Sequence, residues 1–119
     1  MNRIRDKINE INKFLEEFKK IIPKTLKEYE SNIEKKAACE RYFEKIMEAV
    51  TDLAFLIIKD KKFKIPEDDV DAFNVLLKND IIDIDLAEKL KKSKGMKNFI
   101  SHQYGNVDDE IVFESITKE

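Results

Sequence analysis

Glycine and proline each occur only twice in the 119 residues of this chain. These two residues interrupt helices and build most tight turns, so their scarcity favours long helices over a turn-rich β architecture. Apolar residues make up 42% of the sequence and charged residues 40%, a balance that is enough for one hydrophobic core. The sequence therefore predicts an all-α fold and a single domain over residues 1–119.

Apolar residues near the start recur at alternating steps of four and three, which predicts an amphipathic helix over residues 2–22. The stripe consists of Ile4, Ile8, Ile11, Leu15, Phe18 and Ile22. Pro23 ends this helix. We expect this stripe to pack against other helices of the same bundle. Packing against a helix of a partner protein is the alternative.

Two capping-box patterns, Thr25 with Glu28 and Ser31 with Glu34, follow this helix. We expect a short helical turn from Thr25 and a long helix from Ser31 to about Asp60. The apolar stripe of the long helix comprises Ile33, Ala37, Phe43, Ile46, Met47, Val50, Leu53, Ala54 and Ile57.

The second half of the chain predicts three more helices. Pro66 suits the first turn of a helix whose buried side carries Val70, Phe73, Leu76 and Leu77. After a turn over 79–83, a further helix follows Leu86, Leu90, Met96, Phe99 and Ile100 towards Tyr104, and Gly105 stops it. A last helix, capped by Asp108, covers 109–116. The expected architecture is an up-and-down helical bundle of four to five helices.

Bulk properties exclude several classes of protein. The net charge of −2 leaves nucleic-acid binding only to a local patch. Cys39 is the only cysteine, so no disulfide forms within the chain, and a buried thiol in a reducing cytoplasm is expected. The longest uninterrupted apolar run, residues 53–58, is too short to span a bilayer, and the N-terminus has no signal-peptide core.

His102 is the only histidine, and it follows a run of lysines at positions 89, 91, 92, 94 and 97. Histidine exchanges protons near neutral pH, and a cation cluster beside it would hold a phosphate within reach. The alternative is a solvated helix end whose lysines offset the helix dipole. Glu48 and Asp52, four residues apart on the long helix, either touch such a site or lie on a solvated face.

Metal chemistry is not expected. One histidine and one cysteine cannot form a zinc site within the chain, and His102 lacks the Glu-x-x-His spacing of di-iron bundles. Helical spacing instead places Asn98 and His102 on one face, where the amide would orient the imidazole. Lys97 and His102 lie about 140° apart around the helix axis. They would converge through the long lysine side chain or across a two-fold axis with a second chain.

The segment Lys97-Asn98-x-x-x-His102-x-Tyr104 resembles the R-N-x-x-x-H-x-Y signature of HEPN ribonucleases, specifically the HepT-like toxin family. Residues 38–41, 48–54, 66–77, 80–82 and 107–112 also resemble family segments, so the resemblance covers roughly residues 1–117. It implies a cytoplasmic, metal-independent endoribonuclease without a cofactor, which works on RNA as a symmetric homodimer and has no membrane role.

The resemblance also implies residue roles. His102 would transfer protons at the ribose 2′-hydroxyl or the leaving oxygen, and Lys97 would stabilise charge at the phosphorus. Ser101 and Gln103 are lesser candidates for RNA contact. The family partner is an MntA-type minimal nucleotidyltransferase antitoxin, which adds AMP to the motif tyrosine, here Tyr104. Added bulk and negative charge would repel RNA from the cleft.

Lys97 departs from the family signature, which has arginine at this position. Lysine keeps the positive charge but lacks the planar fork that binds two phosphate oxygens together. The sequence therefore predicts either a weakened ribonuclease or an inactive binding subunit that only pairs with a nucleotidyltransferase. An unrelated helical interaction module is a third hypothesis.

Overall fold

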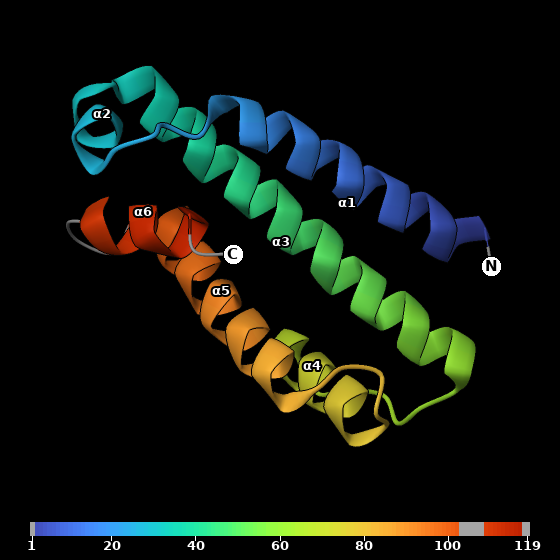
Figure 1. Cartoon of the computed structure of the whole chain (residues 1–119). Coiled ribbons are helices and arrows are strands. Elements are labelled where there is room, and N and C mark those ends of the chain that lie inside the picture. The colour runs from blue at the N-terminus through green and yellow to red at the C-terminus, as the bar shows by residue number, and fades with distance from the viewer. Residues whose placement is uncertain (1, 103–108, 118–119) are drawn as a thin grey trace.

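The computed structural model describes residues 2–102 and 109–117, with the side chains of 3–100 and 110–117. This part of the chain forms six helices (Figure 1): α1 (Asn2–Ile21), α2 (Leu26–Ser31), α3 (Ile33–Lys61), α4 (Asp69–Lys78), α5 (Ile84–His102) and α6 (Asp109–Thr117). The all-α prediction is confirmed. The predicted count of four to five is too low, because the turn expected after Thr25 is a helix of six residues.

The long helix α3 is the centre of the molecule. α1 runs antiparallel along one side of it, and α4 and α5 pack on another side and against each other (Figure 1). α2 and α6 contact each other near the start of α3. The result is an elongated bundle with extents of 47 × 28 × 23 Å.

Asn32 connects α2 to α3. The long helix was predicted to start from Ser31, but it starts at Ile33 with Asn32 as its N-cap. The Asn32 backbone is extended, and its side-chain oxygen accepts a hydrogen bond from the Lys35 amide at 3.0 Å, as an N-cap does. Ser31 still belongs to α2, where its hydroxyl donates to the Glu28 carbonyl at 3.4 Å. Thr25 caps α2 as predicted, since its hydroxyl accepts from the Glu28 amide at 3.1 Å.

The connection between α3 and α4 is also capped on both sides. Lys62 ends α3 in the left-handed conformation with φ of 58°, and its amide donates to the carbonyls of Ile58 and Lys59. Asp68 begins α4 by accepting from the Asp71 amide at 2.8 Å. Pro66 is buried in the connection, so the prediction that it occupies the first turn of the helix is wrong. Asp68 has an extended backbone and is the N-cap, so α4 starts at Asp69, three residues after Pro66.

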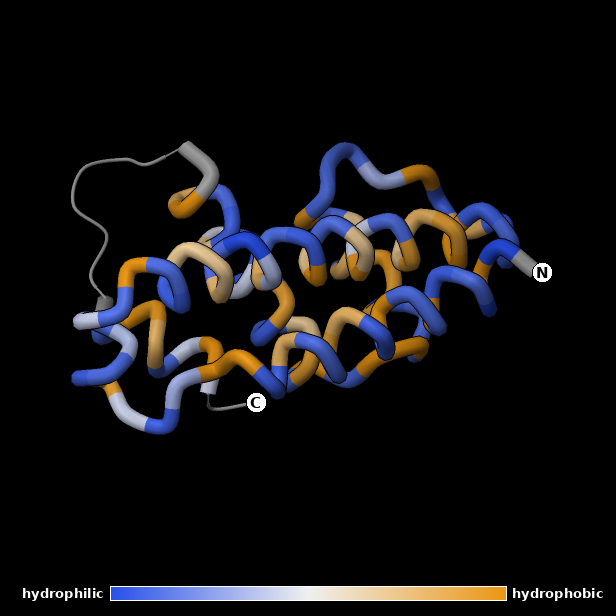
Figure 2. The backbone as a smooth tube through the Cα atoms, turned by 90° about the horizontal axis from the view of Figure 1, so that it is seen from above, coloured by the Kyte–Doolittle hydropathy of each residue, from blue (hydrophilic) through white to orange (hydrophobic). Residues whose placement is uncertain are grey.

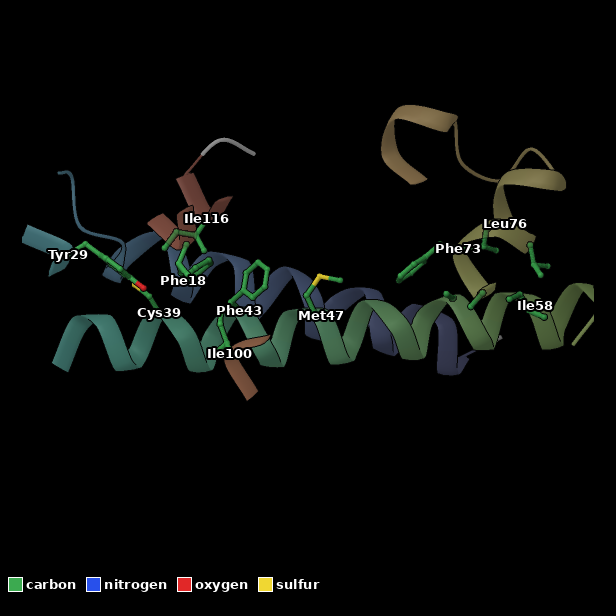
Figure 3. Packing of buried hydrophobic residues seen from close by; sticks show 14 residues of the cluster. Phe18, Tyr29, Cys39, Phe43, Met47, Ile58, Phe73, Leu76, Ile100 and Ile116 are labelled. Carbon is green, nitrogen blue, oxygen red and sulfur yellow. The ribbon is translucent and has the colours of Figure 1, made fainter. Parts of the chain in front are cut away.

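The core extends along α3 (Figure 3). Tyr29, Cys39, Phe18 and Phe43 lie towards one end, and Phe73, Leu76 and Ile58 lie towards the other. Hydrophobic and hydrophilic positions alternate along each helix (Figure 2), as expected when each helix buries one side. Cys39 is fully buried, and burial raises the pKa of its thiol to about 11.

The stripe of α1 packs within the bundle, as predicted. Phe18 is buried and stacks on Tyr42 of α3, with ring centroids 6.0 Å apart and planes inclined by 12°. The Tyr42 hydroxyl donates to Glu17 at 3.0 Å, and this bond raises the pKa of the phenol. Lys45 lies 4.5 Å from the Phe14 ring centroid and 4.9 Å from that of Tyr42. The helix pair is thus held by apolar, aromatic and cation–π contacts together.

Six positions of the predicted apolar stripes are exposed: Ala37, Ile8 by 43%, Ile33 by 80%, Val70 by 38%, Leu86 by 44% and Phe99 by 37%. Periodicity assigns a residue to a side of its helix, but a neighbouring helix must still cover that position. α4 contacts both α3 and α5, so its buried set shifts to Ala72, Phe73, Val75 and Leu76. On α5, Ala87 is buried and the neighbouring Leu86 is exposed. In the part of the chain that the structure describes, no helix has the length and hydropathy to cross a bilayer.

Candidate active site

α5 carries the predicted site residues towards its C-terminal end. Lys97 and Asn98 lie in regular helix, Lys97 half-buried and Asn98 exposed. The backbone of Ser101 and His102 continues the helix, whereas their side chains lie outside the described part of the structure. Gln103, Tyr104, Gly105 and Asp108 are also outside the described residues, so the roles and caps predicted for them stay predictions.

Lys97 lines a groove of about 350 Å³ between α3, α4 and α5. We call this the α3–α5 groove. Its lining residues are Glu48, Thr51, Asp52, Phe55, Asp69, Lys94 and Lys97. Helical spacing explains the set: Glu48, Thr51, Asp52 and Phe55 follow one side of α3, and Lys94 and Lys97 are three apart on α5. The groove therefore gathers opposite charges from three helices.

Lys94 is buried, although its place in a run of lysines predicts an exposed position. A lysine within a run of lysines is expected on the surface as a cation for RNA, yet Lys94 is only 6% exposed. Its ammonium lies 2.9 Å from the carboxylate of Asp69, at the start of α4. Lysine is almost never fully buried without such a partner. This ion pair joins α5 to α4 and fixes one wall of the groove.

Lys97 lies one helical turn beyond Lys94. Among the described residues, none forms an ion pair with it. Glu48 and Asp52 line the same groove and are exposed to solvent. Asp52 also lies 3.5 Å from Lys7 of α1, whose pKa is raised chiefly by its hydrogen bond with Glu10. Lys97 is thus a half-buried groove cation without a described ion-pair partner, and it shares the groove with the carboxylates of Glu48, Asp52 and Asp69.

The outer lysines of the run behave as helix-surface residues. Lys89 pairs with Asp85 at 3.4 Å, and Lys91 pairs with Glu88 at 3.6 Å, both within α5. Exposed pairs of this kind contribute little to stability and release their cations easily. The lysines of the run therefore have three different environments. Lys89 and Lys91 form ion pairs on the surface of α5, Lys94 is buried against Asp69, and Lys97 lines the groove.

Sequence reasoning missed Asp69, Thr51 and Phe55 as groove residues. The pattern around Asp69 indicates only a favourable charge at the positive start of α4. The pair Glu48 and Asp52 could have predicted this groove from the sequence. Two carboxylates on a central helix attract a cation from a neighbouring helix. In the described ranges, no three His, Cys, Asp or Glu side chains gather as ligands for a metal ion.

A family model described as "Ribonuclease HepT-like" matches residues 11–119 of this sequence. The chain belongs to the HepT-like ribonuclease family. The match includes helices α2 to α6 and the second half of α1.

Two curated relatives of this HepT-like protein are named nucleases. A tRNA nuclease HepT of Aphanizomenon flos-aquae is 28% identical over 114 residues, which cover 96% of this chain and 78% of that protein. An mRNA nuclease HepT of Shewanella oneidensis is 34% identical over 65 residues, 55% of this chain and 49% of that protein. A third relative, from Archaeoglobus fulgidus, is 37% identical over 70 residues, 59% of this chain and 52% of that protein. The matches thus span about half the length of two of these relatives.

Solved structures share the fold. A toxin–antitoxin with AMP-PNP superposes with a TM-score of 0.89 at 21% identity, covering 98% of this chain and 88% of that chain. A tri-AMPylated Shewanella oneidensis HEPN toxin in complex with an MNT antitoxin gives a TM-score of 0.81 at 21% identity, covering 98% and 97%. The HepT-like chain is therefore an all-α bundle with a HEPN-like fold.

Proposed function

We propose that this HepT-like protein is a metal-independent endoribonuclease, the toxin of a pair with a nucleotidyltransferase antitoxin in the cytoplasm. The observation that carries the proposal is Lys97, a half-buried cation without a described ion-pair partner in a groove beside the motif histidine. Family membership and the nuclease names of two relatives support it.

The proposed reaction uses the ribose 2′-hydroxyl as the nucleophile. The imidazole of His102 takes the 2′-hydroxyl proton as the oxygen bonds to phosphorus, and the bond from phosphorus to the 5′-oxygen breaks. A proton then passes to the leaving oxygen, which yields a 2′,3′-cyclic phosphate and a 5′-hydroxyl. General acid–base catalysis of this kind contributes roughly 10²- to 10⁴-fold.

Lys97 would stabilise the negative charge on the five-coordinate phosphorus. A half-buried cation is effective because its field is less screened than that of a fully solvated one. Asn98 is proposed to orient the imidazole of His102 one turn away. Ser101 and Gln103 are proposed as RNA contacts, and Lys89, Lys91 and Lys92 as surface cations that draw the RNA backbone towards the groove.

A symmetric homodimer is part of the proposal. Lys97 and His102 lie about 140° apart around α5, so one helix alone presents them in different directions. A two-fold axis near the end of α5 would let Lys97 of one protomer and His102 of its partner act on the same phosphate.

Cleavage of RNA in EDTA tests the enzyme proposal. The wild-type protein should cleave, and the His102→Ala variant should lose about 10² or more of the rate. Equal cleavage by both proteins would assign the activity to a contaminant or to another site. RNA with 2′-O-methyl riboses should resist cleavage because the nucleophile is blocked.

Replacing Lys97 by arginine decides between a weakened enzyme and an inactive binding subunit. A Lys97→Arg variant that cleaves faster than the wild type would support a weakened enzyme, because the guanidinium binds two phosphate oxygens at once. An inert parent that gains nothing from arginine would favour the binding subunit.

Tyr104 is the proposed site of regulation by the antitoxin. The solved HEPN toxin that shares this fold is tri-AMPylated and bound to an MNT antitoxin, which supports the same modification here. Mass spectrometry after co-expression with a minimal nucleotidyltransferase should find AMP on Tyr104 and none on a Tyr104→Phe variant. Unmodified wild-type protein would contradict this part of the proposal.

A further inference from the structure

A second groove, distinct from the α3–α5 groove, lies where the start of α1 meets the end of α3. It has a volume of about 310 Å³ and is lined by Arg3, Ile4, Leu56, Lys59 and Asp60. α1 and α3 run antiparallel, so these two helix ends share one end of the bundle (Figure 1).

The chain that follows Lys59 adds more positive charge at the same end. Residues 59–65 contain four lysines and one aspartate, and Lys59, Lys61, Lys62 and Lys64 are all exposed. Lys62 caps α3 in the left-handed conformation, which turns the chain there. We call Arg3, Lys59, Lys61, Lys62 and Lys64 the basic end.

None of the described residues forms an ion pair with a member of the basic end. The contrast with α5 is clear, because three of the lysines there have carboxylate partners. Lys59 and Lys61 also offset the negative dipole at the end of α3, a task that needs no ligand. That task does not explain Arg3, which lies at the start of α1, where the helix dipole is positive.

Residues of both grooves lie along one side of α3. Asp52, Leu56 and Lys59 are spaced by four and three residues, so they share a side of the helix. Asp52 lines the α3–α5 groove with Lys97, whereas Leu56 and Lys59 line the second groove with Arg3. Lys7, which contacts Asp52, lies one turn from Arg3 on α1. Lys7 thus lies on α1 between the α3–α5 groove and Arg3 of the basic end, and Lys7 is paired with Glu10 and Asp52.

The distances suit one strand of nucleic acid. Seven residues of helix from Asp52 to Lys59 correspond to about 10 Å, and the fourteen from Glu48 to Lys62 to about 21 Å. Phosphates of one strand in a duplex are about 3.4 Å apart along the axis, so the longer span corresponds to about six phosphates.

We infer that the basic end is a second contact surface for the RNA backbone, which holds the strand several nucleotides away from the scissile phosphate. This inference rests on the proposed ribonuclease function. It offers a way for a chain with a net charge of −2 to bind a polyanion, because five cations without a described ion-pair partner lie together at one end of the bundle. The contacts are to phosphates and carry no base specificity.

The test compares two triple variants that remove the same charge. Lys59→Gln/Lys61→Gln/Lys64→Gln changes the basic end and leaves the Lys62 cap intact. Lys13→Gln/Lys19→Gln/Lys20→Gln is the control: all three of its lysines are exposed, and Lys19 and Lys20 occupy the last turn of α1. Both variants therefore weaken a helix C-terminus, and their thermal unfolding checks that each one folds.

Binding of 2′-O-methyl RNA of 4 and of 20 nucleotides is measured by fluorescence anisotropy between 50 and 200 mM salt. For the 20-mer, the basic-end variant should reduce the slope of log K against log salt by about 2, because each phosphate that the protein no longer neutralises lowers the slope by about 0.7. The control should keep the wild-type slope. The reduction in affinity should be larger for 20 nucleotides than for 4.

Equal reductions in the two variants, or an unchanged slope, would overturn the inference while wild-type cleavage leaves the proposed function standing. An unchanged slope together with weaker binding of an antitoxin would assign the basic end to a protein partner instead. A wild-type protein that neither binds nor cleaves RNA would overturn both the inference and the proposed function.

Discussion

Along α3, the side that packs against α1 is closed by aromatic rings, whereas part of the side that faces α4 and α5 is an open groove lined by charges. On the first side, Phe18 and Tyr42 stack, and Lys45 lies over two rings. On the second side, Glu48, Asp52 and Lys97 line a groove of about 350 Å³. One helix thus serves both as a structural support and as the wall of a candidate site.

The difference shows how a small bundle divides its tasks. A closed apolar interface gains free energy from every buried ring, so it supplies stability. A groove cation such as Lys97, which has no described ion-pair partner, adds little of that stability and keeps its field available for a ligand. Lys94 marks the boundary, because it is a groove residue whose charge is matched and buried.

The largest effect is expected on the closed side. Replacing Phe18 by alanine removes a ring that is 6% exposed and stacked on Tyr42, so the free energy of unfolding should fall by about 3–5 kcal/mol. Urea denaturation measures it. A decrease below about 1 kcal/mol would show that α1 is not required to close the core.

On the open side, Lys97→Ala should affect catalysis far more than stability. We expect the turnover rate on RNA to fall on the order of a hundredfold, about 2.7 kcal/mol, because the developing charge at phosphorus loses its cation. The free energy of unfolding should change by less than about 1 kcal/mol. Lys20→Ala, on the exposed end of α1, is the control and should keep the wild-type rate. Equal effects of the two variants would remove Lys97 from the site.

The boundary pair should give an intermediate effect. Asp69→Asn leaves the Lys94 ammonium buried without its partner, a change that costs about 3–5 kcal/mol in fully buried pairs. Because the Asp69 side chain is 45% exposed, solvent screens part of the effect, and we expect about 2 kcal/mol. Asp85→Asn breaks the exposed pair with Lys89 and should cost less than about 0.5 kcal/mol. Denaturation of both variants at one pH makes the comparison.

Cys39, which is fully buried, provides the smallest test. Its thiol has a pKa of about 11 in the folded protein and an ordinary value of 9.0, so between these values the folded state holds more protons than the unfolded state. The thiol therefore makes its full contribution to the free energy of unfolding below pH 9. This contribution is lost as the pH rises towards 11, and about 1.4 kcal/mol of it is lost at pH 10. Cys39→Ala should lack this part of the slope when its stability curve is compared with wild type. Parallel curves would mean that water reaches the thiol.

The sequence predicted most of the helices because apolar spacing and caps are local. The Thr25 cap, the packing of the α1 stripe and the burial of Cys39 needed only neighbouring residues and their periodicity. The errors lie where a local signal had a nearby competitor. Asn32 caps α3 in place of Ser31, and Asp68 caps α4 two residues after Pro66.

Lys94 is the error that matters most for the candidate site. A lysine in a run of lysines is assigned to the surface, since nothing in its neighbourhood reveals a carboxylate 25 positions earlier. The same limit applies to Asp69, Thr51 and Phe55, whose common groove exists only after three helices have packed. For Glu48 and Asp52 the sequence left two interpretations open, and the fold places both residues in the groove.

By itself, the sequence determined the all-α class, the positions of most helices and the motif that leads to the HepT-like family, because propensity, capping and motif spacing act over a few residues. Only the tertiary structure decided which charges meet. The pairing of Lys94 with Asp69, the groove around Lys97 and the separate basic end depend on how helices distant in sequence lie side by side, and Coulomb forces between such groups depend on distance in space.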